Sequence, residues 1–221
     1  MNRCWGIATA ALLLPLIGAS VAGADVVYQN VNPDWTSFQP VDSGEQIGDD
    51  VTLAGTARAV NQFQVVITNQ FTQAYTGTFT ARFFDIGTGG LPNNQLWQGT
   101  VQVTNGQGLE DNRTLTFAVP NVTVPDRFIW SLQADTNLPA PSADGSDGLG
   151  LTINAPPQVG SSQDVAYFFD GTSWSTFDYH DSPPPIDPAT FEATINAIPE
   201  PASLGVLALG GIALLARKRN A

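Results

Sequence analysis

The middle of this chain is a succession of short runs rich in strand-forming residues, separated by turn-forming residues. This pattern is compatible with few folds. In the run 76–85, apolar side chains at 79, 81 and 83 alternate with Thr and Arg, as in a half-buried strand. No interior segment keeps a helical apolar period without Gly or Pro. The pattern predicts an all-β fold, a single antiparallel β-sandwich with a jelly-roll-like arrangement. The other expected strands are 60–68, 96–103, 114–119, 128–134, 149–153, 166–169, 173–177 and 191–195.

The N-terminal residues differ from this pattern and predict an export signal. A positive charge precedes an apolar stretch at 5–17, and Ala22-Gly23-Ala24 fits a small-x-small cleavage site. We therefore expect a signal peptide over residues 1–24, with Ala22 and Ala24 as its cleavage-site residues and Asp25 as the first mature residue. The only cysteine, Cys4, would leave with this peptide, so we expect no disulfide in the mature chain.

The C-terminal tail has three parts in a fixed order. Pro199-Glu200-Pro201 opens it, an uncharged stretch at 204–216 follows, and Arg217-Lys218-Arg219 closes it. The prolines disfavour helix, whereas the uncharged stretch is expected to be helical in lipid. At about 1.5 Å per residue this transmembrane segment spans roughly 20 Å, against a hydrocarbon core of about 30 Å. It is therefore a short anchor, and its basic end favours the cytoplasmic side.

In order and spacing, the tail from Ile198 onward resembles the PEP-CTERM sorting signal of Gram-negative bacteria. The resemblance implies recognition by an exosortase-type membrane protease, with cleavage near Pro199-Glu200-Pro201. It also implies a temporary anchor in the inner membrane, followed by a place at the cell surface or outside the cell. The same tail is sometimes catalogued as an ice-binding protein C-terminal domain, a label that implies no ice binding here.

The expected organisation is a signal peptide (1–24), one β-sandwich domain (25–197) and the sorting signal (198–221). The central region is similar to the β-sandwich domains found ahead of this tail in bacterial proteins of unknown function. That group has no established catalytic residues, so the resemblance assigns no residue a role. The segments that carry it are 47–56, 81–85, 122–126 and 156–162.

The region between the two ends is strongly acidic. It holds four arginines and no lysine against 19 acidic residues, which gives a net charge near −15. Such a charge argues against nucleic acid and against anionic lipids or polymers as partners. It suits a soluble exported domain.

No group of residues gives a catalytic signature. His180, the only histidine, lies beside a proline run, and no Gly-x-Ser-x-Gly elbow presents a serine to it. Asp49 and Asp50 are adjacent in sequence, and neighbours on a strand would point to opposite faces, so adjacency alone forms no acid–base pair. We expect no catalytic residue and no enzyme, although glycosidase carboxylates far apart in sequence stay open as an alternative.

One loop has the composition of a calcium site. The segment 144–148 combines Asp144 and Asp147 with glycines, and calcium prefers carboxylate and carbonyl oxygens on loops. The spacing of an EF-hand is absent, and Asx-turns explain the same residues. Calcium on Asp144 and Asp147 is the single cofactor considered, and otherwise no cofactor is expected.

The expected role is structural or interactive within extracellular polysaccharide. Trp97 and Trp130 lie in strand runs and are expected in the core, and core or edge packing is favoured over stacking on sugars for Trp35 and Trp174 as well. An exposed row of aromatics would favour the alternative, a lectin-like carbohydrate-binding module. A cleft with converging carboxylates would favour the weaker alternative, a secreted hydrolase.

Overall fold

The computed structural model consists of β-strands and connecting turns, without helix, in the residues that it describes. The strands form two antiparallel sheets, which confirms the predicted all-β class and is consistent with a sandwich. The jelly-roll arrangement stays a prediction. The described residues are 23–31, 37–71, 74–105, 111–135, 138, 148–154, 156–163, 165–177 and 190–199.

The first sheet has seven strands. They are β1 (Asp25–Asn30), β2 (Ser37–Pro40), β4 (Ala59–Asn69), β7 (Asp111–Thr123), β9 (Leu149–Asn154), β12 (Thr190–Phe191) and β13 (Ala193–Ile198). The central strand β4 pairs with β7 along one edge. Along the other edge it pairs first with β13 and then with β9. This change of partner divides the sheet, with β1 added beyond β13 and with β2 and β12 on β9.

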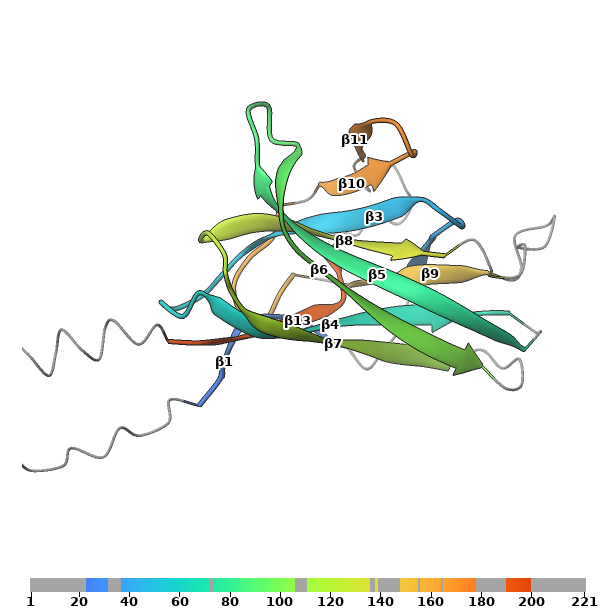
Figure 1. Cartoon of the computed structure of the whole chain (residues 1–221), viewed down its shortest axis with the longest axis horizontal. Helices are drawn as coiled ribbons and strands as arrows, with labels where there is room; N and C mark the ends of the chain where they lie inside the picture. The colour runs from blue at the N-terminus through green and yellow to red at the C-terminus, as the bar shows by residue number, and fades with distance from the viewer. Residues whose placement is uncertain are drawn as a thin grey trace, which may run out of the picture.

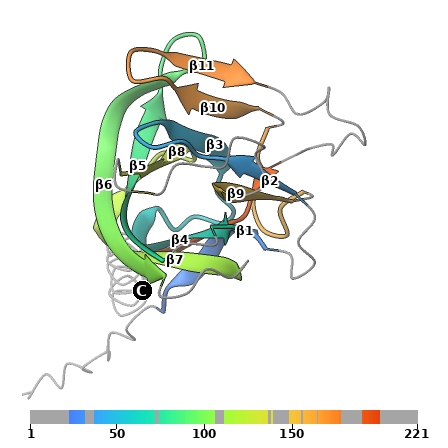
Figure 2. The same ribbon diagram turned by 90° about the vertical axis from the view of Figure 1, so that its right-hand side faces the viewer.

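The second sheet has six strands in the order β11-β10-β3-β8-β5-β6. Their bounds are β3 (Gln46–Thr52), β5 (Tyr75–Ile86), β6 (Pro92–Asn105), β8 (Arg127–Ala134), β10 (Ala166–Phe169) and β11 (Trp174–Phe177). The long hairpin of β5 and β6 crosses the molecule diagonally in Figure 1. Seen from one end, this sheet faces β4 and β7 of the first sheet (Figure 2).

Aromatic side chains from both sheets meet in the core between them. Phe63 on β4 lies with its ring centroid 5.4 Å from that of Phe83 on β5 and 5.3 Å from that of Trp130 on β8. Burying a side chain of this size contributes about 1.5–3 kcal/mol, so these contacts stabilise the pairing of the sheets. Trp97 and Trp130 are both buried, which confirms their predicted place in the core.

A segment between β9 and β10 connects the two sheets along one open side. We call residues 156–163 the strap. The Gln29 amide of β1 donates a hydrogen bond to the Val159 carbonyl at 3.0 Å, and the Thr52 amide of β3 donates to the Ser161 carbonyl at 2.7 Å. The strap therefore joins an edge of the first sheet to a strand of the second.

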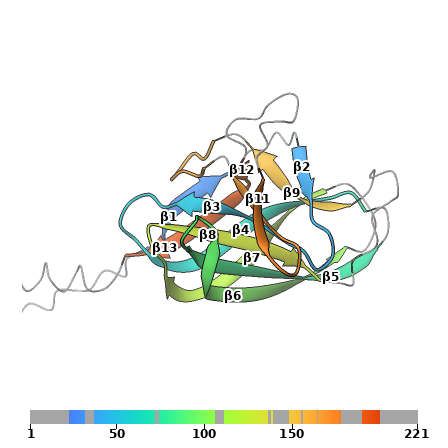
Figure 3. The same cartoon turned by 90° about the horizontal axis from the view of Figure 1, so that it is seen from above.

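The first described strand begins, and the last described strand ends, at the same pole of the molecule. β1 and β13 lie side by side (Figures 1 and 3), and Asp25 is the partner of Ala197 in their antiparallel register. The described residues include no helix long and apolar enough to cross a membrane. The expected membrane segment 204–216 and most of the expected signal peptide lie outside the described residues.

Candidate functional site

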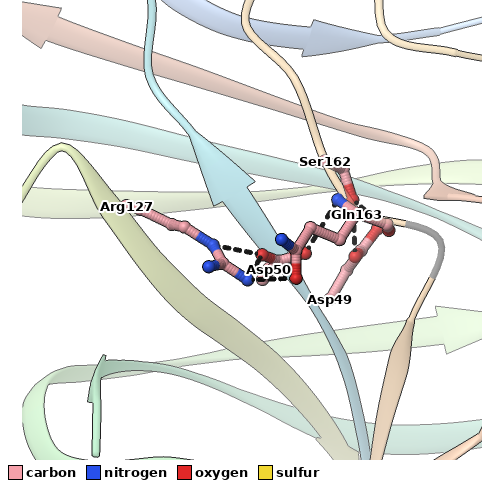
Figure 4. Close-up of polar contacts among 5 residues, drawn as sticks. All are labelled: Asp49, Asp50, Arg127, Ser162 and Gln163. Carbon is pink, nitrogen blue, oxygen red and sulfur yellow. Dashed lines mark hydrogen bonds and ion pairs between the residues drawn. The ribbon is translucent and has the colours of Figure 1, made fainter. Parts of the chain in front are cut away.

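Two adjacent aspartates are buried in the middle of β3, where the strap passes over the strand. The side chains of Asp49 and Asp50 are 1% and 0% exposed. Neighbours on a strand point to opposite faces, and the two carboxylates bind different donors. The Ser162 hydroxyl donates to Asp49 at 2.8 Å (Figure 4), and the Phe191 amide also donates to Asp49 at 3.1 Å.

Asp50 forms an ion pair with Arg127 on the neighbouring strand β8. The Arg127 Nε atom donates to the Asp50 carboxylate at 2.5 Å, and the Gln163 amide donates to the same carboxylate at 3.0 Å. Arg127 also donates to the side-chain oxygen of Gln163 (Figure 4). Charged groups taken out of water need such partners, so this cluster fixes the strap to the second sheet.

Burial sets the protonation behaviour of this cluster. It raises the pKa of the Asp49 carboxyl well above its ordinary value, and the negative charge of Asp50 acts in the same direction. The hydrogen bonds from Ser162 and Phe191 oppose this increase. Burial and the Asp50 charge also raise the pKa of Tyr167 to about 12. The two carboxylates are bonded and closed off from solvent, so we assign the cluster a structural role.

A second feature lies on the outer face of the first sheet. Along β4, Phe63 and Val65 point into the core, so Gln64 and Val66 point outward. There, a groove of about 380 Å³ crosses β1, β13, β4 and β7. No residue that lines it carries a charge.

Cross-strand hydrogen bonds order the amide side chains at this groove. Asn196 on β13 donates from Nδ2 to the side-chain oxygen of Gln62 at 2.7 Å. Gln64 donates from Nε2 to the Thr116 hydroxyl at 3.1 Å. No sequence motif pointed to this groove. Its only sequence signal is the alternation of Gln with core residues in β4, and the other lining residues come from strands that only the sheet order brings together.

The aromatic residues do not form an exposed flat row in the described region. Trp174 on β11 is half-buried, and its ring centroid lies 5.5 Å from Phe84 and 5.2 Å from Phe169. The planes of these ring pairs are inclined by 72° and 41°, so the rings pack against one another. This agrees with edge packing of Trp174, whereas Trp35 lies outside the described residues.

Most of the other predicted site residues lie beyond the described part of the chain. Ala24 is exposed just before β1, and Pro199 is half-buried directly after β13. In the described ranges, no group of three or more His, Cys, Asp or Glu side chains is placed to hold a metal ion. Outside the description are Ala22, Asp144, Asp147, His180, Glu200, Pro201, Arg217, Lys218 and Arg219.

Comparison with known protein families identifies the C-terminal tail. Residues 197–219 match the family model described as the PEP-CTERM protein-sorting motif. The tail is a PEP-CTERM sorting motif. This motif implies export, membrane-associated sorting and processing by an exosortase-type membrane enzyme. Its first two residues, Ala197 and Ile198, are the last two of β13. No curated protein matches this chain in sequence.

Proposed function

We propose that this protein is an exported β-sandwich that an exosortase-type protease cleaves from a temporary membrane anchor. It then has a structural or interactive role in extracellular polysaccharide, at the cell surface or in the matrix. The observation that carries the proposal is the PEP-CTERM motif at residues 197–219, which begins inside the last strand of the sandwich.

The register of β13 supports cleavage beyond the folded domain. This strand is paired on both sides, with β1 and with β4, and Ala197 is fully buried. A protease needs an extended and accessible substrate, so the bond that it cleaves lies after Ile198. Removal of the tail then leaves every strand of the sandwich in place.

The pairing of Asp25 with Ala197 supports processing at both ends. If the signal peptide ends at Ala24 and the anchor begins after Ile198, the two membrane segments leave the domain at the same pole. The domain can therefore complete its first sheet while both segments are still attached. Neither cleavage requires the sheet to open.

We also propose that the protein has no catalytic activity. The support is that the carboxylates of Asp49 and Asp50 are buried and accept hydrogen bonds from Arg127 and from the strap. A secreted hydrolase would instead present converging carboxylates to an open cleft. Calcium at Asp144 and Asp147 stays a separate proposal. If calcium binds there, millimolar calcium should raise the melting temperature of the protein, because a ligand of the native state stabilises it. The double substitution Asp144→Ala with Asp147→Ala should abolish this increase.

The sorting proposal is tested in a host that carries the sorting protease. We expect Glu200→Ala, or Pro199→Ala with Pro201→Ala, to block release, so that the protein stays in the membrane fraction. Removal of residues 217–219 should weaken membrane retention, because the basic end holds the anchor. The matched control is Pro125→Ala, an exposed proline between β7 and β8. If the tail variants were released as efficiently as this control, the sorting proposal would be wrong.

A further inference from the structure

We propose that the groove on the outer face of the first sheet binds a chain of a neutral polysaccharide. This inference rests on the proposed function, because it assigns the extracellular interaction to one surface and one class of ligand. The surface is formed by β1, β13, β4 and β7, and the groove of about 380 Å³ lies within the range of about 300–1,000 Å³ usual for ligand sites.

The lack of charged side chains along the groove indicates which class of ligand it can bind. The region between the two ends has four arginines against 19 acidic residues, yet no charged side chain lines the groove. An anionic polymer would be repelled by the domain as a whole. A cationic partner would find no carboxylate in the groove with which to pair. A neutral ligand avoids both penalties.

The polar side chains of the groove match the hydroxyl groups of sugars. The amides of Gln64 and Asn196 each carry two N–H donors and a carbonyl acceptor, and the exposed Thr114 adds a hydroxyl that donates and accepts. A sugar hydroxyl also donates and accepts, so both sides can be satisfied without any charge. These residues come from the three neighbouring strands β13, β4 and β7.

The amides are already ordered before a ligand arrives. Gln64 donates to Thr116 and Asn196 donates to Gln62, so each amide is held by the strand beside it. One such bond uses a single N–H group and leaves further hydrogen-bonding positions on the same amide. Side chains fixed in this way lose less conformational entropy on binding.

Apolar side chains in the same groove suit the C–H surface of a sugar ring. Val26 and Val31 on either side of Gln29 are the large apolar side chains found exposed in the described residues, at 43% and 40%. Both line the groove, as does Val66. By contrast, Trp174 on the opposite sheet is packed against Phe84 and Phe169, so its ring does not form a flat platform of the kind that sugars stack on.

Binding can be measured on the full-length protein, purified in a detergent with a polyethylene glycol headgroup so that no sugar competes. The probes are dextran, galactomannan and hydroxyethyl cellulose, with alginate as an anionic comparison, in affinity gel electrophoresis and calorimetry. We expect binding to at least one neutral polymer and none to alginate. Gln64→Ala with Asn196→Ala should weaken binding about tenfold or more, because at least two hydrogen bonds are lost.

Two further variants separate the outcomes. The control variant Gln98→Ala removes an exposed amide from the other sheet and should leave polysaccharide binding unchanged. Thr114→Arg places a charged side chain in the groove and should abolish polysaccharide binding. Thermal denaturation checks that each variant is folded. Absence of binding to all three neutral polymers would overturn the inference, as would loss of binding in Trp174→Ala but not in the groove variants. Self-association that Thr114→Arg abolishes, without glycan binding, would assign the groove to a second copy instead. Each result is independent of whether the tail is cleaved.

Discussion

At the scale of single residues, the two adjacent aspartates of β3 show how a buried charge can serve a fold. Asp50 is fully buried but is paired with Arg127 and with the Gln163 amide. Asp49 is bound by the Ser162 hydroxyl and the Phe191 amide. The contacts of Asp50 hold the strap against the second sheet. The contacts of Asp49 connect the strap, through Ser162, to Phe191 on β12.

The buried ion pair predicts a difference between two matched substitutions. Asp50→Asn leaves Arg127 without its carboxylate partner, and we expect the free energy of unfolding to fall by about 2–4 kcal/mol. Asp126→Asn makes the same chemical change in the pair with Arg58, where the Asp126 side chain is 83% exposed. Exposed pairs contribute about 0–1 kcal/mol. Urea denaturation of both variants measures the difference, and equal small losses would contradict the structural role of Asp50.

The raised pKa of Asp49 predicts how stability changes with pH. The folded state holds the Asp49 proton more tightly than the unfolded state, in which the pKa is about 4. This contribution to stability is present below about pH 4 and is lost as the pH rises through the raised pKa. The titratable groups that interact electrostatically with Asp49 are Asp50, Tyr28 and Tyr167, and the substitution described next leaves all three unchanged.

Asp49→Asn removes this titration while keeping the shape of the side chain. We therefore expect the free energy of unfolding of the wild type, relative to that of Asp49→Asn, to decrease between about pH 4 and pH 8. Chemical denaturation of both proteins over this range measures the difference. A difference that stays constant with pH would show that Asp49 titrates in the folded protein as it does in the unfolded chain.

At the scale of elements, the strap depends on a glycine at its crossing point. Gly160 has a φ of 75°, and a Cβ atom there would lie 2.5 Å from the Thr52 carbonyl oxygen of β3. We expect Gly160→Ala to destabilise the protein by about 2–4 kcal/mol, since the left-handed backbone costs about 1–2 kcal/mol and the close contact adds to it.

Gly44 provides the control for this prediction. It has a φ of 88°, but an added Cβ atom would meet nothing within 4 Å. Gly44→Ala should therefore cost only the backbone contribution of about 1–2 kcal/mol. Differential scanning calorimetry compares the two variants. If both lowered the melting temperature equally, the strap would not be held tightly against β3.

The strands predicted from the sequence are those that alternate regularly or that hold a short run of apolar residues. The expected run 60–68 is observed as β4 (Ala59–Asn69), and 76–85 as β5 (Tyr75–Ile86). β3 was not expected, because its sequence contains a glycine and two aspartates that are buried only through contacts with distant segments. The groove was missed for a related reason. Gln64 and Asn196 become neighbours through the pairing of β4 with β13, which no local pattern reveals.

At the scale of the whole molecule, both expected processing sites lie at one pole of the sandwich. The antiparallel register places Asp25 opposite Ala197, and the PEP-CTERM motif begins at that point. The groove lies on the outer face of the sheet that contains both terminal strands. The proposed anchor and the proposed ligand surface therefore belong to the same sheet, and cleavage of the tail leaves that surface intact.

Intact-mass spectrometry of the protein released by a host with the sorting protease tests the central claim most directly. We expect a species that begins at Asp25 and ends close to Pro199, because the signal peptide is removed and β13 protects the chain up to Ile198. A control host without the protease should retain the tail on the membrane-bound protein. Recovery of a stable released species that still carries Trp5 and Arg219 would contradict the account.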